Sequence, residues 1–197
     1  LFIAFGQSKM FKKPLVAFLH LIVYLGFIII NIEVVEIIID GLFGTHRVLS
    51  FMGNFYNFLI GSFEVLAFLV LFACVIFLIR RNIIRIKRFW SAEMKGWPTM
   101  DGNLILIFEI LLMSAFLIMD ASDLILQDKN PSYYHKAGSF PISSFIAPLF
   151  SNLSVDSLIF IERFCWWFHI VGILAFLNYL AISKHLHILL AFPSTYY

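Results

Sequence analysis

The chain has 197 residues, of which 61% are hydrophobic and 13% charged, and its formal net charge is +2. Soluble domains are close to half apolar and a quarter charged, so one soluble core of this size could not bury so much apolar surface. The mean hydropathy of +0.94 therefore predicts a polytopic membrane protein. Cys74 and Cys165 lie far apart in apolar runs, which argues against a disulfide framework, a zinc site and a c-type haem attachment.

Four stretches are long and apolar enough to cross a bilayer, which takes about 20 helical residues. They run from 14 to 39, from 54 to 79, from 102 to 119 and from 164 to 182. The sequence thus predicts an all-α fold, a four-helix transmembrane bundle within 14–190, after an amphipathic lead-in at 1–13. In the polar loop before the last helix, the short apolar piece 145–150 is expected to lie on the surface.

The distribution of Lys and Arg predicts the orientation of this bundle. Ten of the fourteen fall at one end of the predicted helices and four at the other. The positive-inside rule then places both termini in the cytoplasm, and we expect a bacterial or archaeal cytoplasmic membrane. The basic loop after residue 79 indicates contact with anionic lipid and not with nucleic acid.

Histidines inside apolar helices are the main functional signal, because ionisable groups are rare in membrane helices without a use. His169 and His187 are 18 residues apart in the last helix, which is five turns or roughly 27 Å on one face. His20 lies at the depth of His187 in the first helix, with His185 as the alternative partner if the last helix kinks. Such a pair predicts a b-type haem with two axial imidazoles, which transfers electrons and has no open coordination position.

A second haem would need a partner for His169. His46 is the candidate if the turn after the first helix dips into the bundle, and Arg47 would then neutralise a propionate. His135 in the outer loop is expected to be solvated. The alternative for each membrane histidine is a plain hydrogen bond to a neighbouring helix.

The segment "FHIVGILAFLNYLAISKHLHILLAFP" resembles the last helix of the gamma subunit of respiratory nitrate reductase. It resembles still more the cytochrome b membrane domain of heterodisulfide reductase-type iron–sulfur proteins. In that family a histidine of the last helix is followed five turns later by a second, and His169 and His187 stand at these positions. An earlier helix supplies further ligands, and "AFLHLIVYLG" offers His20. The nitrate reductase pattern has another histidine three turns on, where this chain has Ile30 and Asn31.

The resemblance implies electron transfer between a quinone pool and cytoplasmic iron–sulfur clusters through haem b. The [4Fe–4S] clusters would belong to a partner or to a domain that begins near 191–197, within a larger respiratory complex. Two other functions stay open, a haem-free scaffold subunit of a respiratory assembly and a small ion transporter.

A quinone site would need a route for protons, and the first two helices offer carboxylates for it. Glu33 and Glu36 are three residues apart and so share a helix face. Together with Glu64 they are predicted to form a proton route for quinol oxidation. The alternative is that the first helix ends near Asn31 and that both acids lie in water.

Overall fold

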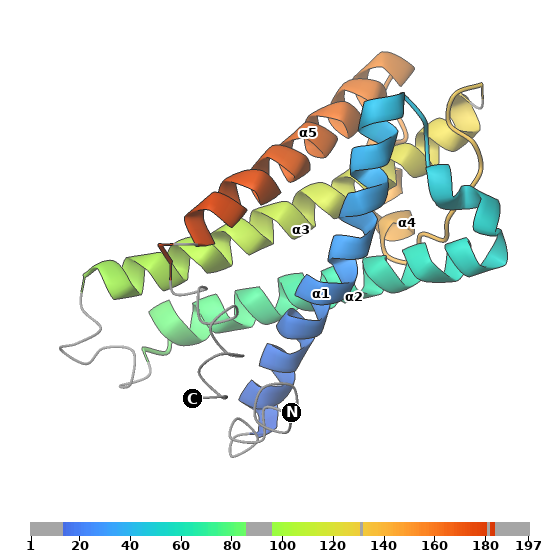
Figure 1. The fold of residues 1–197 in the computed structure, drawn as a ribbon. Coiled ribbons are helices and arrows are strands. Elements are labelled where there is room, and N and C mark those ends of the chain that lie inside the picture. Colours follow the sequence, from blue (N-terminus) through green and yellow to red (C-terminus); the bar gives the residue numbers. More distant parts are fainter. Residues whose placement is uncertain (1–13, 86–95, 131, 181, 184–197) are drawn as a thin grey trace.

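The computed structural model describes residues 14–85, 96–130, 132–180 and 182–183, and in these ranges every regular element is helical. The predictions for 1–13, for 191–197, and for His185 and His187 lie outside the described residues. In chain order (Figure 1) the elements are α1 (Pro14–Phe43), the 3-10 turn η2 (Val48–Met52), α2 (Asn54–Asn82), α3 (Trp97–Lys129), α4 (Ser143–Ile146), the 3-10 turn η5 (Ala147–Phe150) and α5 (Val155–Leu180).

Four of these helices, α1, α2, α3 and α5, are long and apolar enough to cross a membrane. Many of their large apolar side chains face outward, among them Phe58, Phe72 and Phe160. Exposed apolar surface of this extent is typical of contact with lipid and not with water. The predicted all-α fold with four membrane-spanning helices is therefore confirmed.

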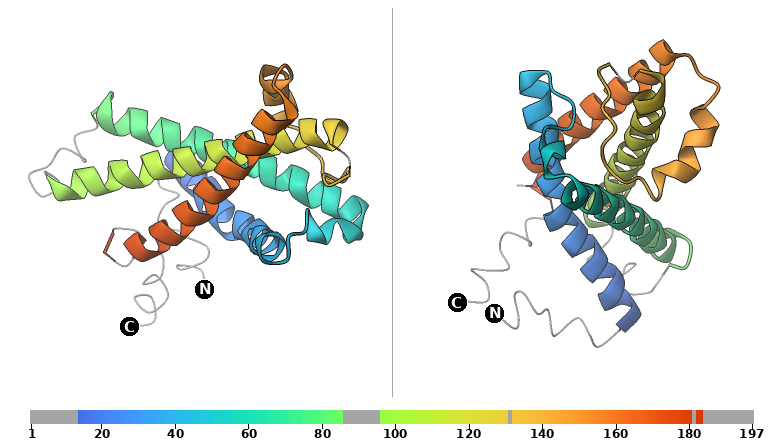
Figure 2. Two further views of the ribbon diagram at one scale, coloured as in Figure 1. Left: turned by 90° about the horizontal axis from the view of Figure 1, so that it is seen from above. Right: turned by 90° about the vertical axis from the view of Figure 1, so that its right-hand side faces the viewer.

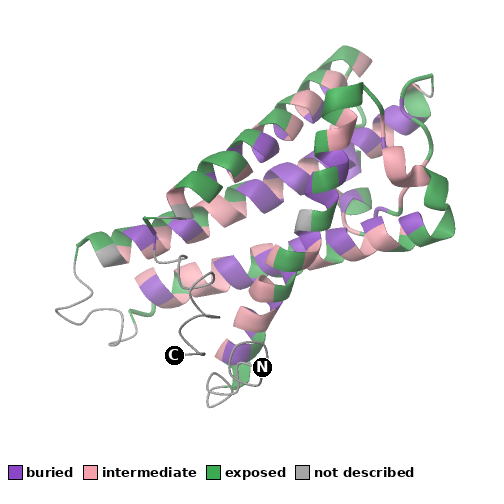
Figure 3. Ribbon diagram, in the orientation of Figure 1, coloured by how far each residue is buried: buried purple, intermediate pink, exposed green. Residues whose placement is uncertain are grey.

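Helix α3 lies at the centre of the bundle. It packs along α5 on one side and α2 on the other, while α1 packs mainly against α2 and crosses α5 (Figures 1 and 2). Figure 3 shows the buried residues concentrated along α3 and on the facing sides of its neighbours. Two glycines of α1 permit close approach, because an added Cβ would lie 2.3 Å from Val70 at Gly26 and 2.6 Å from Trp166 at Gly41.

The helices extend further than the hydropathy pattern indicated. Helix α3 begins at Trp97, with proline in its first turn, a position where proline favours helix initiation and does not break the helix. It continues ten residues past Met119 because its polar residues there are buried and bonded within the protein. Helix α5 begins at Val155, nine residues before the predicted start.

Helix α1 continues to Phe43, so the alternative in which it ends near Asn31 is wrong. Both acids that this alternative placed in water are buried, with Glu33 and Glu36 each 3% exposed. The apolar piece at 145–150 lies at the surface as expected, since Phe145 and Leu149 are largely exposed. It is attached through the buried Ser143, whose hydroxyl donates to the Leu117 carbonyl at 3.0 Å.

The end of the bundle nearest Arg80 and Arg81, called the Arg-rich end below, has polar contacts of its own. The Asn82 and Asn103 amides exchange hydrogen bonds of 3.3 and 2.9 Å between α2 and α3. The Tyr179 hydroxyl donates to Asp101 between α5 and α3. These contacts fix the register of α2, α3 and α5 at this end, opposite the site described next.

Candidate functional site

Arg47 is the centre of a charged cluster at the end of the bundle opposite the Arg-rich end. Its guanidinium donates to Asp123 at 2.7 Å and to Asp120 at 2.8 Å, both on α3. Its backbone N–H donates to Asp40 at 2.7 Å, and the guanidinium lies 4.9 Å from the centre of the Phe140 ring. Burial opposes the charge on Arg47, but the two aspartates raise its pKa well above the ordinary value, so it stays a cation.

Carboxylates of α1 and α2 complete this cluster on the other side. Glu36 accepts the Tyr56 hydroxyl and the backbone N–H of Leu49, both at 2.9 Å. Glu64 is 0% exposed and accepts two backbone N–H groups at the start of α4, those of Ile142 at 2.9 Å and Ser143 at 3.3 Å. The turn after α1 and the loop after α3 therefore supply the donors that hold these acids.

Helix α5 contributes Glu162 and Arg163, which form an ion pair at 3.2 Å. Glu162 also accepts the hydroxyl of Tyr134 at 3.2 Å. Burial and the neighbouring Glu162 raise the pKa of Tyr134, so it remains a neutral hydroxyl donor. His46 packs its ring against Tyr134, with 4.9 Å between ring centres.

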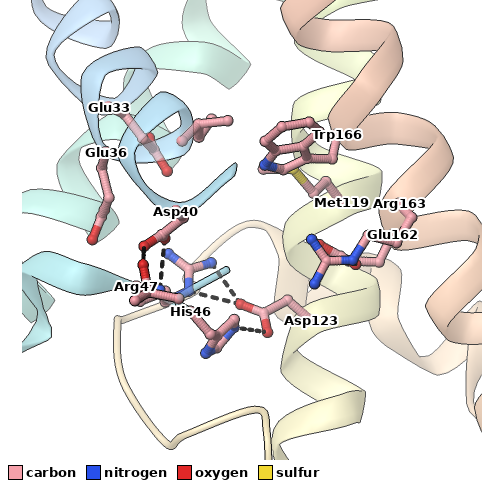
Figure 4. A pocket seen from close by; sticks show the side chains of 12 residues that line it. Glu33, Glu36, Asp40, His46, Arg47, Met119, Asp123, Glu162, Arg163 and Trp166 are labelled. Atoms are coloured by element: carbon pink, nitrogen blue, oxygen red, sulfur yellow. Dashed lines mark hydrogen bonds and ion pairs between the residues drawn. The ribbon is translucent and has the colours of Figure 1, made fainter. Parts of the chain in front are cut away.

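A pocket opens among these side chains between α1, α3 and α5 (Figure 4). Its volume is about 50 Å³, which is room for a few water molecules and far too little for a haem. Its polar lining consists of Glu33, Glu36, Asp40, Thr45, His46, Arg47, Asp123, Glu162 and Arg163.

The cluster carries more buried carboxyl groups than buried cations. Six acids at this end are less than 9% exposed, whereas Arg47 is the buried arginine among the described residues of the same end. The acids are Glu33, Glu36, Glu64, Asp120, Asp123 and Glu162. An uncompensated buried charge costs several kcal/mol, so these groups cannot all be ionised together. Some of these carboxyl groups are therefore expected to stay neutral in the folded protein.

The structure brings some of the predicted site residues together and separates others. Glu33, Glu36, Glu64 and Arg47 all belong to this one cluster. The guanidinium of Arg47, expected near a haem propionate, is instead bound to two aspartates.

His46 and His169 do not meet in the structure. His46 bonds Asp123 at 2.9 Å, while the Nδ1 atom of His169 lies 3.2 Å from the Leu112 carbonyl. Leu112 and Asp123 are eleven residues apart on α3, or roughly 16 Å along its axis. Two imidazoles that ligate one iron must lie on opposite sides of it, so this separation leaves the predicted pair unsupported.

His169 nevertheless has the chemistry of a metal ligand. It is 1% exposed. Because its Nδ1–H donates to a backbone carbonyl, its Nε2 atom carries a lone pair that is free to bind a metal. Many histidines that bind metals are oriented in this way. No group of three or more His, Cys, Asp or Glu side chains in the described ranges is arranged to hold a metal ion, whereas a bis-histidine haem needs only two imidazoles from the protein.

His20 lies two turns before Phe27, which packs with Phe176 and Tyr179 near the end of α5. It is half-buried and sits in the part of α1 that adjoins the Arg-rich end of the bundle. Its expected partner follows α5 and lies outside the described residues. His135 is exposed, as expected.

Asp120 and Asp123 are functional candidates that the sequence analysis did not select. The hydropathy pattern predicts that the third helix ends at Met119, which places both acids beyond the predicted helix. A signal was present, because Asp120, Asp123 and Gln127 recur with spacings of three and four residues, which places them on one helix face. In the structure this face is turned inward, and Gln127 donates to Asp123 at 3.3 Å.

Two curated proteins are similar to nearly all of this chain. One is the "Probable iron-sulfur-binding oxidoreductase FadF" of Bacillus subtilis, 32% identical over 188 residues, which are 94% of this chain and 24% of that protein. The other is the "EtfAB:quinone oxidoreductase" of Syntrophomonas wolfei, 25% identical over 191 residues, which are 94% of this chain and 25% of that protein. The chain thus spans about a quarter of the length of each of these relatives.

No family model matches the chain, and no solved structure matches it either. The similarity therefore connects this four-helix membrane segment with oxidoreductases whose names refer to iron–sulfur binding and to quinone. Resemblance to the nitrate reductase gamma subunit finds no support in these comparisons.

Proposed function

We propose that this chain is the membrane-spanning part of an oxidoreductase that passes electrons between quinone in the bilayer and iron–sulfur clusters on the Arg-rich side. The observation that carries the proposal is similarity over 94% of the chain to one relative named for iron–sulfur binding and another named for quinone. Four membrane-spanning helices provide the bilayer location that a reaction with quinone requires. The clusters would lie on a further domain or on a partner of a respiratory complex, with both chain termini on the cytoplasmic side of a bacterial or archaeal membrane.

A b-type haem, when bound, would supply single-electron transfer between these two sites. His20 and His187 are the residues we expect to hold it, near the Arg-rich end. His169 is a further candidate ligand, because its Nδ1–carbonyl contact leaves Nε2 available. We do not include His46, since its ring is bound to Asp123.

The charged cluster at the opposite end would accept the protons of quinol. Oxidation of a quinol to a quinone releases two electrons and two protons, and the protons need acceptors that can reach water. Glu33, Glu36 and Glu64 are buried in one cluster, and the pocket beside them connects it to the surface. A site with too few cations for its acids suits this role, because proton uptake there removes buried charge.

The test is a reduced-minus-oxidised optical spectrum of the intact protein that contains this chain, purified from membranes. We expect a sharp alpha band of b-type haem that is lost in His20→Ala and in His187→Ala. His135→Ala is the matched control and should retain the band, because His135 is exposed in the loop after α3. A protein without any alpha band would favour the haem-free alternatives, and full absorbance in both ligand variants would overturn the ligand assignment.

A further inference from the structure

Three carboxyl groups from three different helices lie close enough to interact, and one of them lines the pocket. Glu33 of α1, Glu64 of α2 and Asp120 of α3 are 3%, 0% and 0% exposed. Each has one buried oxygen without a hydrogen-bond partner in the structure: Oε2 of Glu33, Oε1 of Glu64 and Oδ2 of Asp120. The three groups also interact electrostatically with one another.

Two of the three acids have donors that compensate a negative charge. Asp120 accepts the Arg47 guanidinium at 2.8 Å. Glu64 accepts the two backbone N–H groups at the start of α4, and such bonds favour the ionised form. Glu33 receives no comparable bond from the described residues, and its Oε2 is buried without a partner.

The cations near Glu33 are bonded to other acids, although the charge of Arg47 also acts on Glu33. Arg47 divides its guanidinium between Asp120 and Asp123, and Arg163 is paired with Glu162. Charged groups that act on Glu33 are Glu36, Arg47, Glu64 and Asp120. The other ionisable groups that line its pocket are Asp40, His46, Asp123, Glu162 and Arg163. A carboxylate at Glu33 would thus be a buried charge next to other carboxylates, which is strongly unfavourable.

We propose that Glu33 is a proton-binding site of this membrane protein, and that it exchanges its proton with water in the pocket. Of the three acids, Glu33 lines the pocket, and Figure 4 shows it with Glu36 on the side that α1 turns toward the pocket. The half-buried Asp40 and the exposed Thr45 line the same pocket nearer the surface.

The exchange is a simple acid–base step. The O–H bond of the Glu33 carboxylic acid breaks, its proton passes to a pocket water, and the negative charge stays on the carboxylate. Proton uptake reverses the step and restores the neutral acid. That quinol is the source of the incoming proton rests on the proposed function above, whereas the existence of the proton site does not.

Infrared difference spectroscopy tests the proposal. The difference is taken between the intact oxidised protein in H₂O and in D₂O, without added quinone. A protonated carboxyl gives a carbonyl stretch distinct from that of a carboxylate, and the band shifts when H₂O is replaced by D₂O. We expect this exchange-sensitive band at neutral pH. In Glu33→Gln the band should lose the share of its area that one protonated carboxyl group contributes. Glutamine is the neutral counterpart of the protonated acid, so this variant should fold.

Asp128→Asn is the control, since Asp128 is an exposed acid outside the cluster and pairs with Lys136 at 2.7 Å. It should leave the band unchanged, and Glu33→Asp should shift the band without abolishing it. Full band area in Glu33→Gln, or equal loss in Asp128→Asn, would overturn the proposal. Because the measurement needs neither haem nor quinone, a failure of the proposed electron transfer would leave this result unaffected.

Discussion

Replacement of Arg47 by methionine tests whether this side chain holds the charged end of the bundle together. Methionine keeps a long apolar stem but removes the two charged hydrogen bonds to Asp123 and Asp120, at 2.7 and 2.8 Å. The side chains of Arg47, Asp120 and Asp123 are 9%, 0% and 5% exposed, so bulk water replaces little of the lost bonding. Removal of one member of a buried ion pair costs about 3–5 kcal/mol, and we expect a loss of this size in the free energy of unfolding.

Arg163→Met is the matched control for this experiment. The Arg163 side chain is 39% exposed and pairs with one carboxylate, that of Glu162, at 3.2 Å. Because water reaches Arg163 and only one acid loses its partner, we expect a smaller loss than for Arg47. The assay is reversible unfolding of the purified protein in mixed micelles with increasing sodium dodecyl sulfate, followed by circular dichroism.

A double-mutant cycle makes the comparison specific to charge. When Asp120→Asn and Asp123→Asn are already present, Arg47→Met should cost less than half as much, because no uncompensated carboxylate remains at those positions. Equal losses in Arg47→Met and Arg163→Met would refute the central role of Arg47. An undiminished loss in the asparagine background would show that packing, and not charge, is responsible.

Two further predictions concern topology and helix packing. In intact cells, a cysteine introduced by Ser132→Cys should react with an impermeant thiol reagent, whereas one introduced by Ser91→Cys should not. The opposite labelling would contradict the predicted orientation. Gly26→Ala should destabilise the bundle by about 1–3 kcal/mol through overpacking, since its Cβ would lie 2.3 Å from Val70. Gly61→Ala should cause no such loss in the same unfolding assay, because the nearest atom would lie 3.4 Å away, and equal losses would argue against a close contact between α1 and α2.

The membrane-spanning helices were predictable from composition because lipid selects apolar side chains over a span of fixed length. Their ends were less predictable. Hydropathy alone ended the third helix at Met119, yet α3 continues to Lys129, since the bundle supplies Arg47 and His46 as partners for its aspartates. A window of hydropathy records only the polarity of a side chain and not the bonds that compensate it.

The sequence by itself determined the class of this protein, its four membrane helices and the presence of acids in the first and second of them. Only the tertiary structure decided that Glu33, Glu64 and Asp120 from three helices share one buried cluster, and that Arg47 serves two aspartates. It also decided that His46 bonds Asp123 while His169 lies beside Leu112, at another height of α3. The physical reason is that helical periodicity fixes which residues share a face of one helix, whereas the rotation and height of neighbouring helices depend on close packing at positions such as Gly26 and Gly41.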